Sequence, residues 1–192
     1  MSTTSTPRGV APVRKKPAIR KLGAVAPNKP HAKTYKGAKK LTAKRVRDPS
    51  GTLSVLTLLG GDEVMHAQPR TFLEWIEVIR EGIPSSAAET LARRIHVSQA
   101  EFSTFLNIPE RTLVRRKGEG VLNSEESAKL VRMARVVERA SEVFDELDAA
   151  LDWLKSPNAA LSGAIPMSLL DTEIGAKEVM DTLGRIEHGV FV

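Results

Sequence analysis

The chain has 192 residues, a formal net charge of +6 and no cysteine. The absence of cysteine excludes disulfide bonds, thiolate metal sites and cysteine nucleophiles, and agrees with a reducing cytoplasm, where we expect the protein to act. No apolar run is long enough to span a membrane. The N-terminus lacks the apolar core of a secretory signal, although its basic character leaves a transit peptide as an alternative.

The positive charge is concentrated in one part of the sequence. Residues 1–48 hold 14 lysine and arginine residues and one acid, Asp48, whereas the other 144 residues hold 15 basic and 22 acidic residues. Residues 1–50 are rich in proline, glycine, alanine and lysine and have no apolar period, so we predict a disordered basic arm. This arm either follows DNA phosphates or is only a solubilising extension. Its single aromatic residue, Tyr35, gives no support for single-strand binding.

A linker follows over residues 51–70 and carries the short apolar segment "TLSVLTLLGG", which suits either a two-turn helix or an edge strand. Apolar residues then recur at helical spacing as far as Gly82, which predicts a helix that ends there. These residues are Phe72, Trp75, Ile76 and Ile79.

Two capping boxes predict the starts of the next helices, one from Ser86 to Glu89 and one from Ser98 to Glu101. The second box is flanked by apolar residues at the spacing of a hydrophobic staple, namely Val97 and Phe102. A long helix is predicted from Asn123, with Glu126 at its third position.

Two apolar series at seven-residue spacing run along the long helix, which a single coiled coil would use. They are Leu130, Val137, Phe144, Leu151 and Met133, Ala140, Leu147, Leu154. We favour a break at "FDELD", with Asp145 capping a second helix. Pro166 opens a short helix, and Asp171 caps the last one. Its apolar face consists of Ala176, Val179, Met180, Leu183 and Ile186. Nothing alternates with period two, so the predicted fold is all-α.

The segment "SQAEFSTFLNIPERTLVRRKG" has the layout of a helix-turn-helix, which we place within a domain over residues 71–122. Asn107 tolerates the left-handed conformation of the turn, Pro109 suits the start of the second helix, and Ser103 is small where the helices cross. The residues that would pack the two helices together are Phe102, Leu106, Ile108 and Leu113.

The second helix of this segment is basic and would enter the major groove of DNA. We expect Arg111, Thr112 and Arg115 near base edges. The residues expected nearer the phosphate backbone are Gln99, Arg116 and Lys117. Arg116 stands where a second apolar anchor is common, which argues against tight operator binding. The alternative is that the basic helix end is a solvated face that complements the helix dipole. Because one such motif binds weakly alone, a homodimer is implied.

Residues that would support enzymatic chemistry are missing from the sequence. The four histidines show no metal-ligand spacing, and there is no glycine-rich phosphate loop and no nucleophile elbow. Two acidic pairs, Glu125 with Glu126 and Asp145 with Glu146, suit helix surfaces or caps better than acid–base catalysis. We therefore expect no enzyme, no catalytic residue, no metal site and no cofactor.

The second half of the chain resembles the Xre/MbcA/ParS antitoxins. The similarity covers roughly residues 70–192 and includes "RTLVRRKGEGVLNSEESAKLVRMARVVERASEVF" and "ALDWLKSPNAALSGAIPMSLLDTEIGAKEVMDTLGRIEHGVFV". The resemblance implies a cytoplasmic antitoxin of a type II toxin–antitoxin pair, in which an Xre-like helix-turn-helix domain binds operator DNA and represses the operon. A C-terminal helical domain, here residues 123–192, would bind a RES-type toxin that depletes NAD, within a larger toxin–antitoxin complex.

The resemblance further implies that the antitoxin C-terminus blocks the toxin's active site. The matching residues are Gly184, Arg185, Glu187, Gly189, Val190 and Phe191. An aromatic residue on a short tail suits a partner's pocket, which explains an apolar chain end. Two alternatives are that the tail folds back on its own core, and that the protein is a standalone transcriptional regulator whose C-terminal domain only dimerises.

Overall fold

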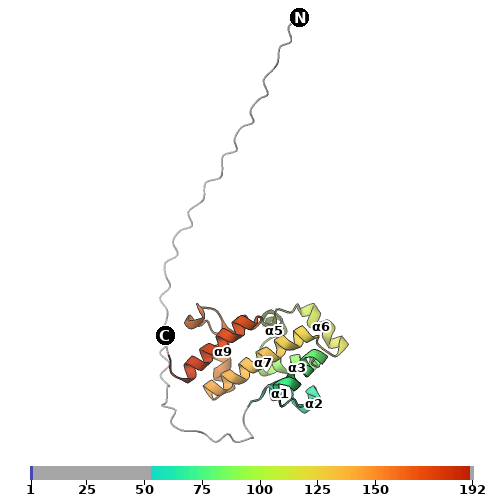
Figure 1. Ribbon diagram of the computed structural model, residues 1–192, viewed down its shortest axis with the longest axis horizontal. Helices are drawn as coiled ribbons and strands as arrows, with labels where there is room; N and C mark the ends of the chain where they lie inside the picture. Colours follow the sequence, from blue (N-terminus) through green and yellow to red (C-terminus); the bar gives the residue numbers. More distant parts are fainter. Residues whose placement is uncertain (2–52, 191–192) are drawn as a thin grey trace. The chain divides into compact units, whose positions relative to one another are not determined.

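The computed structural model describes Met1 and residues 53–190, and residues 53–190 are built from helices and loops (Figure 1). Within this range no strand occurs, and the β-type pairing is limited to an isolated bridge between Pro84 and Val121. The all-α prediction is confirmed, whereas the predicted disordered arm lies outside the described residues. The elements are α1 Val55–Leu58, α2 Asp62–Met65, α3 Phe72–Glu81, α4 Ser85–Arg94, α5 Gln99–Leu106, α6 Glu110–Glu119, α7 Ser124–Phe144, α8 Leu147–Lys155, the short 3-10 helices η1 Ala159–Leu161 and η2 Pro166–Leu169, and α9 Glu173–Glu187.

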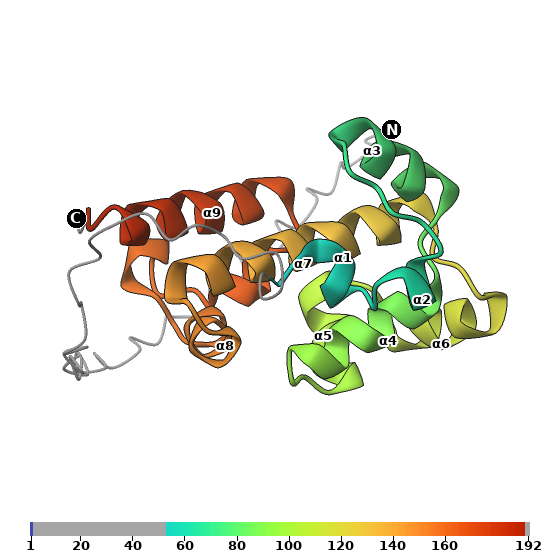
Figure 2. The ribbon, with the colours of Figure 1, turned by 90° about the horizontal axis from the view of Figure 1, so that it is seen from below.

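Helix α7 is the central element of the folded part. It packs against α1, α3, α5, α8 and α9. Figure 2 shows α4, α5 and α6 towards one end of α7, and α8 and the C-terminal end of α9 towards the other. The inward side chains of α7 are fully buried, among them Leu130, Met133, Ala134, Val137 and Ala140. The apolar series at seven-residue spacing therefore packs inside one chain.

The predicted break after α7 is confirmed, but its details differ from the prediction. Asp145 adopts a left-handed conformation, with φ of 64°, and ends α7. It does not cap α8, because Glu146 is the residue that precedes that helix. The chain thereby reverses and lays α8 beside α7.

The apolar segment before α3 forms neither a strand nor a two-turn helix. It makes the single turn α1, in which the Ser54 side chain accepts a hydrogen bond from the Thr57 amide. Leu58 and Leu59 are both completely buried. Gly60 and Gly61, with φ of 105° and 66°, then end the turn in a conformation that suits glycine.

Local capping signals located the starts of two helices, α5 and α7. The capping boxes at Ser98 and Asn123 are both present, and Asn107 ends α5 with φ of 50°. The box predicted at Ser86 is wrong, since α4 begins one residue earlier and the Ser85 amide donates to the Gly120 carbonyl at 3.0 Å. Thr172, and not Asp171, caps α9 by accepting from the Gly175 amide at 3.1 Å.

A lysine links the two ends of the fold. The Lys155 ammonium at the end of α8 donates to the backbone carbonyls of Ile95 and His96, which follow α4, at 2.7 and 3.0 Å. Among the described residues, no helix has the length and apolar character needed to cross a membrane.

Candidate functional site

Helices α5 and α6 form a helix-turn-helix unit whose turn is fixed by hydrogen bonds. The Ile108 amide donates to the Ser103 carbonyl at 3.0 Å, and the Ser103 hydroxyl donates to the Ile108 carbonyl at 2.6 Å. Ser103 is buried, so its side chain satisfies a polar group that water cannot reach. The predicted packing residues Phe102, Leu106, Ile108 and Leu113 are all buried, as expected.

The outer face of α6 presents most of the predicted DNA-binding residues. Arg111 and Arg115 are exposed, and Thr112 is partly exposed. Lys117 is exposed and pairs with Glu89 of α4 at 2.8 Å. Gln99, at the first position of α5, lines the same small hollow as Lys117. Five of the six predicted residues therefore lie on accessible parts of α5 and α6.

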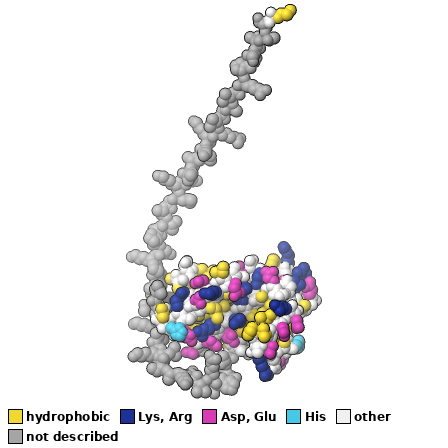
Figure 3. All heavy atoms as spheres, viewed as in Figure 1, with side chains coloured by type: hydrophobic (Ala, Val, Ile, Leu, Met, Phe, Trp, Pro, Cys, Tyr) yellow, Lys and Arg dark blue, Asp and Glu magenta, His cyan; other side chains and the backbone are white. Residues whose placement is uncertain are grey.

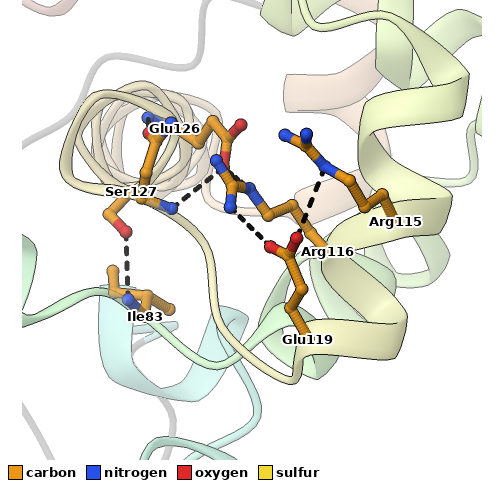
Figure 4. Close-up of polar contacts among 7 residues, drawn as sticks. Ile83, Arg115, Arg116, Glu119, Glu126 and Ser127 are labelled. Carbon is orange, nitrogen blue, oxygen red and sulfur yellow. Dashed lines mark hydrogen bonds and ion pairs between the residues drawn. The ribbon is translucent and has the colours of Figure 1, made fainter.

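Arg116 differs from the other five predicted residues. Only 17% of its side chain is exposed, and its guanidinium donates to Glu126 at 2.7 Å and to Glu119 at 2.5 Å (Figure 4). These two hydrogen bonds raise the pKa of the guanidinium above its usual value. Glu126 is buried and also accepts from the Asn123 amide at 2.9 Å. Arg116 thus joins α6 to the start of α7, in the place of an apolar anchor, and we leave it out of the proposed DNA-contacting set.

The C-terminus of α9 ends in a defined turn. Gly189 has φ of 68°, its amide donates to the Ile186 carbonyl at 3.1 Å, and the Val190 amide donates to the Arg185 carbonyl at 2.9 Å. This pair of bonds is a Schellman motif, which favours glycine at the left-handed position. It fixes the direction in which the chain leaves the helix, with Val190 53% exposed.

A groove of about 510 Å³ lies beside this turn. Arg185 and Val190, two of the predicted toxin-binding residues, both line it, together with Trp153 of α8 and Ile186 of α9. The Arg185 guanidinium donates to the Thr182 hydroxyl at 2.8 Å, which holds it along the groove wall. The groove combines several apolar side chains with the Arg185 guanidinium, a combination that suits a partner's side chain.

The other predicted toxin-binding residues are placed differently. Glu187 pairs with Arg139 of α7, which lowers the pKa of its carboxyl below the usual value. Gly184 faces open space, since a Cβ atom there would have no neighbour within 4 Å. Phe191 lies outside the described residues.

Several residues that line the groove were not predicted from the sequence. The ring of Trp153 packs 5.7 Å from that of Phe144, centroid to centroid, and Trp153 also lines the groove. Asn158 and Thr182 were not singled out. No local pattern marks them, because they meet only when α8, η1 and α9 pack together.

Helix α3 carries an apolar face that the described part of the chain leaves uncovered. Phe72 is 74% exposed, and Leu73 and Ile76 are exposed beside it, whereas Trp75 and Ile79 pack against the core. Figure 3 shows apolar side chains gathered on the surface over this region. The apolar residues at helical spacing in α3 therefore lie on two faces of the helix, one packed against the core and one exposed to solvent.

Two family models match the chain. Residues 74–135 match the antitoxin Xre-like helix-turn-helix domain. Residues 139–189 match the antitoxin Xre/MbcA/ParS C-terminal toxin-binding domain. The two matched regions meet within α7.

Curated relatives carry related names. A protein from Yersinia enterocolitica named Antitoxin Xre is 35% identical over 118 residues, which are 60% of this chain and 80% of the relative. Another Antitoxin Xre, from Photorhabdus laumondii, is 33% identical over 115 residues, 59% of this chain and 78% of the relative. A Sphingobium protein named Prs ADP-ribosylating antitoxin is 28% identical over 126 residues, 60% of this chain and 79% of the relative.

Proposed function

The chain belongs to the Xre family of antitoxins, and we propose that it neutralises a RES-type, NAD-depleting toxin by placing its C-terminus at the toxin's active site. The family has a toxin-binding domain that covers residues 139–189 here. The name of the Sphingobium relative, which joins ADP-ribosylation to an antitoxin, supports a partner with NAD-related chemistry. In this role the protein acts by binding and carries out no reaction itself.

The observation that carries this proposal is the exposed end of α9. The Schellman motif holds Val190 at the surface, and two more apolar residues, Phe191 and Val192, follow it in the sequence. Arg185 and Trp153 lie in the groove beside it. An apolar anchor next to a fixed guanidinium is the kind of centre from which protein interfaces gain most of their affinity.

The proposal is tested by measuring NAD in cells that express the toxin candidate from the adjacent gene. One culture also expresses the intact chain, and a second expresses a chain that ends at His188. We expect the cellular NAD concentration to stay unchanged in the culture with the intact chain and to fall in the culture with the truncated chain. Protection by both chains would move the inhibitory contact away from the tail. Unchanged NAD with the toxin candidate alone would overturn the toxin class.

We further propose that the helix-turn-helix binds operator DNA and autoregulates the operon. Arg111, Thr112 and Arg115 would face base edges, and Gln99 and Lys117 would face phosphates. Helix α6 and the C-terminal end of α9 lie at opposite ends of the folded part (Figure 2), so one molecule could bind DNA and toxin together. Binding of the purified chain to its own upstream DNA, with a steep loss in salt, tests this role.

A homodimer is the third part of the proposal, with α3 as its contact. Phe72, Leu73 and Ile76 form a contiguous exposed apolar face, which is uncommon on a monomer surface. Glu77 and Arg80 are exposed on the same helix and offer opposite charges to a second copy. Two copies would present two α6 helices to successive major-groove faces, as helix-turn-helix proteins require for tight binding.

A further inference from the structure

Val114 is an exposed apolar residue in the middle of α6. Val114 is 64% exposed, whereas the preceding residue, Leu113, is buried. Arg111, three positions before Val114, and Arg115, one position after it, are both exposed. The three residues therefore lie on one stripe of the helix surface. Valine is a weaker helix former than alanine, lysine or glutamate, and here it gains no burial in return. Its side chain is therefore free to contact a partner of α6.

We propose that Val114 contacts the 5-methyl group of a thymine in the operator and so adds sequence specificity to DNA binding. This inference rests on the proposed entry of α6 into the major groove. The thymine methyl is the apolar group that base edges present there, and the other edges offer hydrogen-bond donors and acceptors that an isopropyl group leaves unpaired. Apolar side chains accordingly select thymine at such positions.

The spacing of the stripe places this thymine relative to the arginine contacts. Four residues of α-helix advance about 6 Å, which is close to two base-pair steps of about 3.4 Å. Arg111 and Arg115 therefore reach positions about two base pairs apart, and Val114 lies on the stripe between them. Gly118, the next residue on this stripe, has no side chain to hold the helix away from the groove.

The test uses the full chain and DNA from upstream of its own gene. A footprint first defines the bound sequence. A series of duplexes then replaces each thymine in the footprint, one at a time, with deoxyuridine, which keeps base pairing and removes only the methyl group. We expect one thymine position in each half-site to be sensitive to this change. Each such single replacement should weaken binding of the native chain about fourfold, which corresponds to the burial of one methyl group.

Two variants assign the effect to the side chain. V114A should bind the unmodified DNA about as weakly as the native chain binds a duplex in which the sensitive thymine is replaced in both half-sites, and it should lose sensitivity to that replacement alone. V121A alters an exposed valine after the end of α6 and should keep the native pattern.

The possible failures are distinguishable. The thymine contact would be wrong if the native chain binds the DNA but is insensitive to every thymine replacement. It would also be wrong if V114A keeps the sensitivity of the native chain. Either result would leave the DNA-binding proposal intact. Absence of sequence-specific binding, both to the upstream fragment and to duplexes selected from a random library, would overturn the DNA-binding proposal and this inference with it.

Discussion

The Arg116 guanidinium donates a 2.7 Å hydrogen bond to the Glu126 carboxylate, and this contact joins the second helix of the helix-turn-helix to the first turn of α7 (Figure 4). Glu126 is 7% exposed, and its carboxylate also accepts a hydrogen bond from the Asn123 amide. Removal of the arginine would leave a buried carboxylate short of a partner, which is costly in a protein interior.

We therefore expect R116A to lower the free energy of unfolding far more than R115A, measured by urea denaturation. Arg115 is exposed and pairs with Glu119 at 3.5 Å, so R115A should leave stability nearly unchanged. In DNA binding, R115A should weaken binding by about 1–3 kcal/mol and relax the sequence preference at the base pair that Arg115 contacts. Equal stability of the two variants would contradict the structural role of Arg116, and the double variant R116A/E126A should lose less than the sum of the single losses.

Replacement of Ser103 tests the turn between α5 and α6. In S103A the buried Ile108 carbonyl loses the hydroxyl donor at 2.6 Å, so the free energy of unfolding should fall by about 1–3 kcal/mol. S141A is the matched control, because the Ser141 hydroxyl donates to the Val137 carbonyl within a continuous helix. S141A should lower the free energy of unfolding by less than S103A does. A neutral S103A would show that water or a shifted backbone satisfies the carbonyl.

A pair of glycine variants tests the turn at the end of α9. G189A places a side chain at φ of 68° and should destabilise the protein by about 1 kcal/mol, while weakening toxin inhibition because the tail leaves the helix in another direction. G184A lies inside the helix, where alanine has no close neighbour, and should stabilise by about 0.5–1 kcal/mol. Full inhibition by G189A would argue against a fixed exit of the tail.

The half-buried Glu138 gives a pH-dependent prediction. Burial raises the pKa of its carboxyl above 4.5, although the Val55 amide, which donates to it at 3.0 Å, works in the opposite direction. A raised pKa means that the folded state binds more protons than the unfolded state, so this residue's contribution to stability falls as the pH rises through the range just above 4.5.

E138Q keeps a carbonyl acceptor for the Val55 amide and has no charge to bury. The free energy of unfolding of E138Q should therefore increase relative to that of the native chain as the pH rises from 4 to 7. Thermal unfolding across this range measures the difference. A constant difference between the two proteins would show that burial does not shift this carboxyl.

A charged residue on the exposed face of α3 tests the dimer. L73E should convert the proposed dimer to a monomer in sedimentation experiments and weaken DNA binding, without lowering the stability of the folded chain, because Leu73 is exposed. I174E is the control, since Ile174 is an exposed apolar residue on α9. A dimer that survives L73E would move the contact to another surface.

Features that depend on a few neighbouring residues were accessible from the sequence. The capping boxes at Ser98 and Asn123, the left-handed Asn107 and the apolar residues of the helix-turn-helix were all predicted, because their geometry is set within about one helical turn. Even so, the box at Ser86 was wrong, since the backbone of Gly120, 35 residues away from Ser85, satisfies the start of α4.

Taken by itself, the sequence therefore determined the helical fold, the helix-turn-helix and the resemblance of the C-terminal half to a family of antitoxins. The tertiary structure alone decided that Arg116 faces Glu126, that part of the α3 apolar pattern faces solvent, and that Trp153 and Arg185 share a groove. The physical reason is that helical periodicity and capping are local interactions, whereas burial, ion pairing and groove formation depend on which distant helices pack together.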